Sequence, residues 1–117
     1  MKYVLLDESK VIADGSIVHR IEGSDGRAGG FVGSLENLSQ EGLCWLHGDS
    51  LAYGSARVME DAQVFGEASG NCVVGGEAQL YGRAFGHAVL RGRCKVYGTV
   101  GGNQVIEGDS VLYGNIE

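Results

Sequence analysis

From Ala56 onward, residues of the same kind return every sixteen positions. The matching columns are two aliphatic (Val58, Val74, Leu90 and Ile106; Val64, Leu80, Val96 and Leu112), one aromatic (Phe65, Tyr81, Tyr97 and Tyr113) and two of glycine (Gly66, Gly82, Gly98 and Gly114; Gly54, Gly70, Gly86 and Gly102). A fixed period of this length is typical of a solenoid, in which each repeat forms one coil that packs on its neighbours. The repeat therefore predicts the architecture before any single residue is considered.

Each repeat contains a shorter unit, a small residue followed two places later by an aliphatic one, as in Ala62 and Val64. In an extended segment these two side chains lie on the same face, which we expect to point inward. The glycines between units can adopt the positive φ of a sharp corner. A helix does not fit, because its faces repeat near 3.6 residues and each interior glycine costs about 1 kcal/mol. The sequence predicts an all-β, triangular parallel β-helix.

Residues 1–37 lack the repeat. Short alternating or β-branched segments predict two or three antiparallel strands there, at residues 2–6, 10–13 and 16–21, with residues 7–9 and 14–15 between them and a loop at 24–30. A solenoid exposes unpaired backbone and apolar interior at its ends, so repeat arrays need atypical terminal units. We expect one domain in which residues 1–37 cap a β-helix formed by residues 38–117. Leu35, Leu38 and Trp45 are expected to close the capped end.

The repeat units also carry a resemblance to a known family. Segments 62–66, 78–84 and 94–98 resemble the hexapeptide repeats of left-handed β-helix proteins. Residues 29–45, after the opening segment 2–8, resemble more narrowly the phage- and prophage-associated, YdcK-like acyltransferase branch. The resemblance implies left-handed winding. It also implies the acyltransferase arrangement of the class, a histidine base at a subunit interface beside a loop that protrudes from a coil. The coils here are shorter than those of that branch.

His87 is the one weak candidate for such a base. It shares a corner column with Ser55, Asn71 and Asn103, which favours a simpler reading, that the corner needs a residue tolerant of the left-handed backbone region. No coil from residue 56 to 117 carries an insertion that would form a lid. We therefore expect no catalytic residue and no cofactor. We also expect no metal site, because Cys44, Cys72 and Cys94 lack metal-binding spacing and are expected to be buried, reduced thiols.

Composition narrows the partner classes. The chain has 117 residues and a net charge of −6, which argues against nucleic acid binding. No apolar stretch of about 18 residues and no signal-peptide layout is present, so we expect a cytoplasmic protein without a membrane partner. Basic and acidic residues alternate between coils and are expected to form cross-strand pairs: Arg83, Arg91, Arg93 and Lys95 with Glu77, Glu107 and Asp109.

The outward columns are the remaining candidates for function. Val73, Val89 and Val105 form an apolar stripe, and stripes of this kind often mark interfaces. With Leu112 and Tyr113 near the carboxyl-terminal coil, they predict a homo-oligomer, a dimer or trimer. The aromatic column of Phe65, Tyr81 and Tyr97 is either self-stabilising or a ladder for a ligand or partner.

Three functions remain open. The first, which we favour, is a non-catalytic protein-binding or scaffold β-helix, a phage or prophage accessory protein that contacts a host or phage protein through its flat faces. The second is a hexapeptide-repeat acyltransferase relative with His87 facing a neighbouring subunit. The third is a viral inhibitor of a host defence factor, which masks its partner or sequesters a small ligand between subunits.

Overall fold

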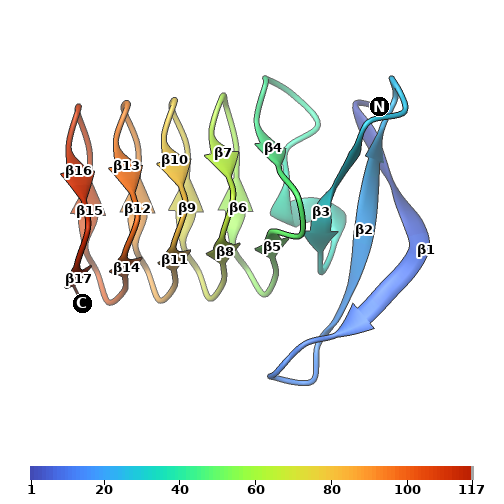
Figure 1. The fold of residues 1–117 in the computed structure, drawn as a ribbon, viewed down its shortest axis with the longest axis horizontal. Coiled ribbons are helices and arrows are strands. Elements are labelled where there is room, and N and C mark those ends of the chain that lie inside the picture. Colours follow the sequence, from blue (N-terminus) through green and yellow to red (C-terminus); the bar gives the residue numbers. More distant parts are fainter. Residues whose placement is uncertain (117) are drawn as a thin grey trace.

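A computed structural model describes residues 1–116, and it has the predicted parallel β-solenoid of about five turns. Coils are stacked side by side along the longest axis of the molecule, and an antiparallel hairpin stands across one end (Figure 1). Strands in successive regular coils pair in parallel at the sixteen-residue offset, as between Val73 and Val89. The predicted spacing and cap are therefore confirmed. Left-handed winding stays an expectation from the resemblance.

Three sheets form the three sides. The first has eight strands, in spatial order β1 (Tyr3–Val11), β2 (Ile17–Gly23), β3 (Ala28–Val32), β5 (Leu51–Ala52), β8 (Glu67–Ala68), β11 (Arg83–Ala84), β14 (Thr99–Val100) and β17 (Asn115–Ile116). The second has five, β4 (Trp45–Leu46), β7 (Gln63–Val64), β10 (Gln79–Leu80), β13 (Lys95–Val96) and β16 (Val111–Leu112). The third has four, β6 (Arg57–Val58), β9 (Val73–Val74), β12 (Val89–Leu90) and β15 (Val105–Ile106).

The interior consists of the predicted inward columns. Val58, Val74 and Leu90 on one side and Val64, Leu80 and Val96 on the next are buried, as are the small residues before them. Backbone hydrogen bonds join each coil to the next, for example from Val73 N to Ala88 O at 2.9 Å. Period-two alternation thus places one side chain of each two-residue strand inside and the other outside.

The corner glycines are of two kinds, and the sequence analysis had recognised only one. Gly54, Gly70, Gly86 and Gly102 have φ between 59° and 67°, as expected for sharp corners. Gly66, Gly82 and Gly98 do not have positive φ. A Cβ on Gly82 would lie 1.9 Å from the carbonyl oxygen of Gly98, so these glycines are needed because adjacent coils approach closely.

The cap is part of the solenoid wall, because β3 pairs in parallel with β5 and antiparallel with β2. Two details of the predicted cap were wrong. Residues 7–9 lie within β1, where a register shift between Leu5 and Ser9 forms a bulge, and β3 begins inside the predicted 24–30 loop. A short 3-10 helix, η1 (Leu35–Asn37), leads to the first coil.

The residues expected to close the capped end differ in burial. Leu38 and Trp45 are buried, whereas Leu35 is 45% exposed and does not contribute to the closure. Trp45 lies edge to face with Tyr3, with 6.3 Å between ring centroids, and the Arg27 guanidinium covers its ring at 4.1 Å. Neither Tyr3 nor Arg27 was expected in the cap core from the sequence.

Candidate functional site: an aromatic groove along one corner

The aromatic column forms a continuous stack of parallel rings along one corner of the solenoid. Ring centroids of Phe65, Tyr81, Tyr97 and Tyr113 are separated by 4.7, 4.7 and 5.2 Å, with interplanar angles of 5° to 7°. This spacing follows the distance between paired strands, so the backbone ladder sets the ring separation. The rings face each other and present their edges to solvent.

His47 extends the stack by one ring, which the sequence analysis had missed. Its imidazole is stacked on Phe65 at 4.5 Å and 11°, and its Nε2 lies 2.5 Å from Gln63 Oε1. His47 does not align with the aromatic column in the sequence, because Trp45 pairs with Gln63 across eighteen residues instead of sixteen. Two additional residues before Leu51 absorb the difference, so that Leu51 pairs with Glu67 at the regular offset.

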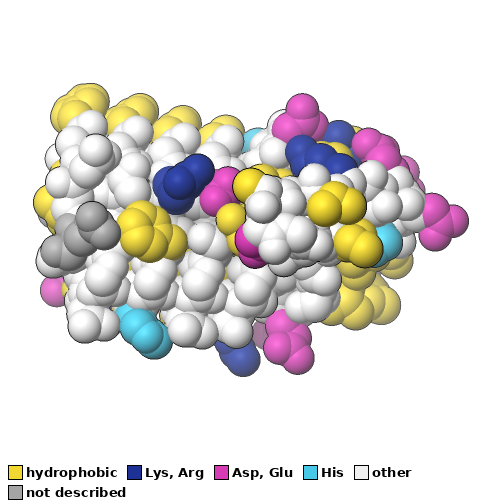
Figure 2. Space-filling model, turned by 90° about the horizontal axis from the view of Figure 1, so that it is seen from below, with side chains coloured by type: hydrophobic (Ala, Val, Ile, Leu, Met, Phe, Trp, Pro, Cys, Tyr) yellow, Lys and Arg dark blue, Asp and Glu magenta, His cyan; other side chains and the backbone are white. Residues whose placement is uncertain are grey.

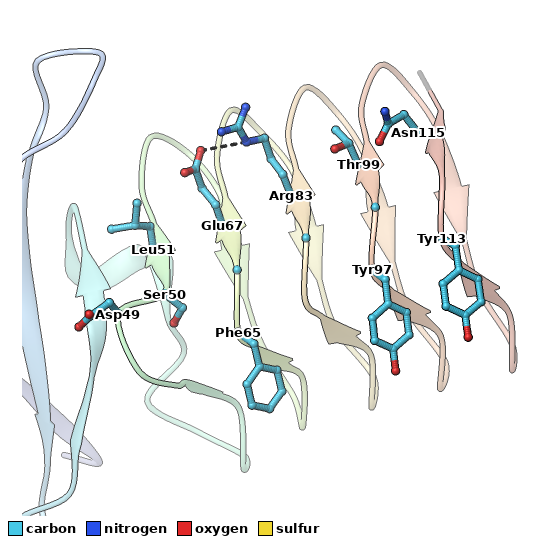
Figure 3. Close-up of a pocket in the computed structure, with 13 residues that line it drawn as sticks. Asp49, Ser50, Leu51, Phe65, Glu67, Arg83, Tyr97, Thr99, Tyr113 and Asn115 are labelled. Atoms are coloured by element: carbon cyan, nitrogen blue, oxygen red, sulfur yellow. Dashed lines mark ion pairs between the residues drawn. The ribbon is translucent and has the colours of Figure 1, made fainter.

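A shallow groove of about 780 Å³ runs beside this stack. One wall is aromatic, the floor is the column of closely spaced glycines, and the opposite wall is polar (Figure 3). The lining residues are Asp49, Ser50, Leu51, Phe65, Gly66, Glu67, Gly82, Arg83, Tyr97, Gly98, Thr99, Tyr113 and Asn115. The groove exists because no side chain projects from the glycine floor between the two walls.

An ion pair lies on the polar wall. Arg83 Nε lies 3.5 Å from Glu67 Oε2, and the same carboxylate accepts a 2.8 Å hydrogen bond from Tyr53 Oη. Partial burial and the bond to Glu67 raise the pKa of Tyr53, so this hydroxyl remains a donor at neutral pH. Thr99 and Asn115 continue the wall toward the carboxyl-terminal coil with neutral side chains. The groove can therefore offer hydrogen bonds but carries no strong net charge.

The histidines have different surroundings. His87 is exposed, is not among the residues that line the groove, and does not have the positive φ that we had inferred from its corner column. The left-handed conformation belongs to Gly86 before it, so that interpretation was wrong. His19 Nδ1 lies 3.1 Å from the Leu6 carbonyl oxygen, within the bulge of β1.

The predicted valine stripe lies on the third sheet. Val73, Val89 and Val105 are in parallel register on the outer face, next to Arg57. Val73 and Val89 are half-buried, and only Val105, at 48%, is exposed. At the carboxyl-terminal coil, Leu112 is partly buried, whereas Tyr113 is 77% exposed. The aromatic corner therefore exposes more apolar surface than the valine stripe does.

Two of the predicted charge pairs on the coils are present, whereas Arg83 pairs with Glu67, which was not in the predicted set. Arg91 Nε lies 2.7 Å from Glu107, and Arg93 Nε lies 3.1 Å from Asp109, one coil away in each case. These pairs are exposed, so each contributes about 0–1 kcal/mol to stability. Cys44, Cys72 and Cys94 are buried and free, as expected. Burial raises the pKa of Cys72 to about 11, which keeps this thiol protonated and unreactive at neutral pH.

Among residues 1–116, no three or more His, Cys, Asp or Glu side chains are grouped so as to hold a metal ion. The helical structure described is too short and too polar to cross a bilayer. Comparisons of the chain with family models, with curated proteins and with solved structures returned no match.

Proposed function

We propose that this chain is a non-catalytic protein-binding or scaffold β-solenoid that works through its outer columns. One observation carries the proposal: the stacked aromatic column lies beside a groove whose floor and walls are held by backbone ladders in every regular coil. Such a surface is rigid before it meets a partner, so binding costs little ordering entropy. Repeat proteins commonly use extended surfaces of this type for recognition.

Several finer assignments belong to the same proposal. We assign the chain to the left-handed hexapeptide-repeat proteins and, within them, to the phage- and prophage-associated, YdcK-like branch, on the repeat units quoted above. We place it in the cytoplasm, since three buried free thiols suit a reducing compartment. We also propose that it is a homo-oligomer that meets host or phage proteins. The net charge of −6 favours partners with basic surfaces.

The proposal is tested by comparing partner binding with acyl transfer. The chain is used to capture proteins from its native host, and each captured protein is then purified and titrated against it by calorimetry. We expect at least one direct complex, weakened more than tenfold by an outward substitution, Val89→Glu or Thr99→Arg, in a variant that circular dichroism shows to be folded. Saturable binding of coenzyme A, or acetyl transfer that His87→Ala abolishes, would replace this proposal with the acyltransferase one.

A further inference from the structure

The aromatic column and the groove beside it form a ridge and a hollow on the same corner of the molecule. Figure 3 shows both running along the stack of coils, with the rings on one side and Glu67, Arg83, Thr99 and Asn115 on the other. Figure 2 also shows a row of evenly spaced hydrophobic side chains along the coil half of the molecule. A surface that carries a ridge next to its own hollow is complementary to itself under a two-fold axis.

We propose that two copies of this chain pair through this corner, with the aromatic ridge of each in the groove of the other and their long axes antiparallel. The inference rests on the proposed function, because it names one partner of the proposed binding surface. We favour this corner over the valine stripe because its side chains are more exposed to solvent. The four rings are 42, 38, 44 and 77% exposed, whereas two of the three valines are half-buried.

The repeat distance favours a second copy as the occupant. Rings recur along the ridge every 4.7 to 5.2 Å, a spacing set by paired strands. An extended peptide advances about 3.3 Å per residue, so it falls out of step with the rings within a few residues. A second solenoid has the same spacing and matches the ridge at every coil.

The exposed rings set the size of the dimer interface. Together the rings expose the equivalent of about two whole aromatic side chains, or about 400 Å² at roughly 200 Å² each. The ridges of two protomers therefore bring about 800 Å² in total into the contact, which is the size of a weak, transient interface. We expect a weak dimer for this reason.

Ring geometry argues against a small planar ligand or a sugar along the ridge. Such ligands stack on ring faces, but the faces of Phe65, Tyr81 and Tyr97 are already covered by the neighbouring rings. Ring edges and hydroxyl groups remain accessible along the ridge, with one ring face at its end, on Tyr113. Edges pack well against other ring edges and faces, which a second ridge supplies.

Charge decides the relative orientation. With parallel axes, each Glu67 would lie beside the Glu67 of the other copy and each Arg83 beside the other Arg83. With antiparallel axes and full overlap, Glu67 lies at the level of the other copy's Asn115, and Arg83 at the level of its Thr99. The second arrangement brings no like charges together, so it is the more stable.

Sedimentation velocity of the purified chain from about 1 μM to several hundred μM tests the proposal. We expect a monomer–dimer equilibrium. Thr99→Arg should raise the dimer dissociation constant at least tenfold, because the new cation enters the groove at the level of the other copy's Arg83. Val105→Arg, on the third sheet at 48% exposure, is the matched control and should change the constant less than twofold. Circular dichroism melting confirms that both variants are folded.

Three results would overturn the proposal: a wild-type monomer at the highest concentration, a Thr99→Arg variant that dimerises like the wild type, or a Val105→Arg variant that dissociates. Tyr113→Ala is a second, independent test. It removes the most exposed ring and should weaken the dimer without disturbing the rest of the stack. The measurement uses the chain alone. It can therefore fail while direct binding to a host protein succeeds, and the reverse holds as well.

Discussion

The regular coils and the amino-terminal cap bury apolar side chains by different means. In the coils, every inward residue lies between equivalents one coil away, and backbone hydrogen bonds supply most of the polar contacts. In the cap, individual polar side chains hold the strands. Gln40 Oε1 accepts hydrogen bonds from Lys2 N and Tyr3 N, its Nε2 donates to Tyr3 O, and Tyr3 Oη donates to the Leu38 carbonyl.

Arg20 is the clearest example of a cap-specific contact. Its guanidinium donates to Glu8 and Asp49, each at 2.9 Å, and to the Gly29 carbonyl at 2.7 Å, while covering the Phe31 ring at 4.3 Å. This one side chain connects the bulge in β1 to the first coil. The coils therefore depend on which class of residue occupies a column, whereas the cap depends on particular residues.

The largest expected effect on stability distinguishes the inward side chain of one coil strand from its outward neighbour. Val74→Asp places an unpaired charge in the interior, which costs several kcal/mol of a total stability near 5–15 kcal/mol. We expect this variant, and Leu80→Asp, to be unfolded by circular dichroism. Val73→Asp, next door on β9, faces outward beside Arg57 and should melt within a few degrees of the wild type. Normal melting of Val74→Asp would contradict the conclusion that the inward columns must be apolar.

The second prediction tests coil-to-coil approach within the glycine floor. Gly82→Ala would place a Cβ 1.9 Å from Gly98 O, so two coils must separate, at a cost of about 3 kcal/mol. Gly114 belongs to the same column, and a Cβ there meets nothing within 4 Å. Gly114→Ala should therefore change the free energy of unfolding by less than about 0.5 kcal/mol. Equal effects in urea denaturation would show that contact between coils is not the reason for these glycines.

The third prediction concerns alkaline pH. Burial raises the pKa of Cys72 from an ordinary value of 9.0 to about 11. The contribution of this thiol to stability is present in full below about pH 9 and is lost as pH rises toward 11, because only the unfolded thiol ionises easily. Cys72→Ala places at this position the alanine found at Ala56 and Ala88. Between pH 7.5 and 10.5, its free energy of unfolding should fall by about 2 kcal/mol less than that of the wild type, as measured by urea denaturation. Parallel pH profiles of the two proteins would refute this.

The smallest expected effect tests the cap. Arg20→Ala removes a partly buried cluster of charged hydrogen bonds and should cost about 1 kcal/mol after allowance for solvent screening. The exposed Arg93, paired with Asp109, is the matched control from the coils, and Arg93→Ala should have little effect. Thermal melting at low and high salt measures both. A larger loss of stability from Arg93→Ala than from Arg20→Ala would contradict the dependence of the cap on individual side chains.

The stability of the protein at acid pH tests the Arg20–Asp49 pair of the cap. The hydrogen bond from Arg20 lowers the pKa of Asp49, so the stability from this pair is present above the usual carboxyl pKa near 3.9 and is lost as pH falls through the lowered value. Asp49→Asn should flatten the acid limb of the stability profile. An unchanged acid limb would mean that the pair does not link the cap to the first coil.

The repeat alone was enough to predict the solenoid, its three sides and its inward columns. This was possible because alternation and a sixteen-residue period leave few ways to bury Val58, Val74 and their equivalents together. The stacked rings were predictable for the same reason, since column mates must lie one strand spacing apart. Cross-strand pairs such as Arg91 with Glu107 follow from that rule too.

Only the tertiary structure decided the features that break the period. His47 joins the ring stack through an eighteen-residue offset, and Gln40 and Arg20 contact residues 37 and 29 positions away, which no local pattern indicates. The groove also needed coordinates, because the glycine floor is set by how closely Gly82 approaches Gly98. Columns are determined by period, which a sequence displays, whereas caps and hollows are determined by distances between coils and non-repeated segments, which it does not.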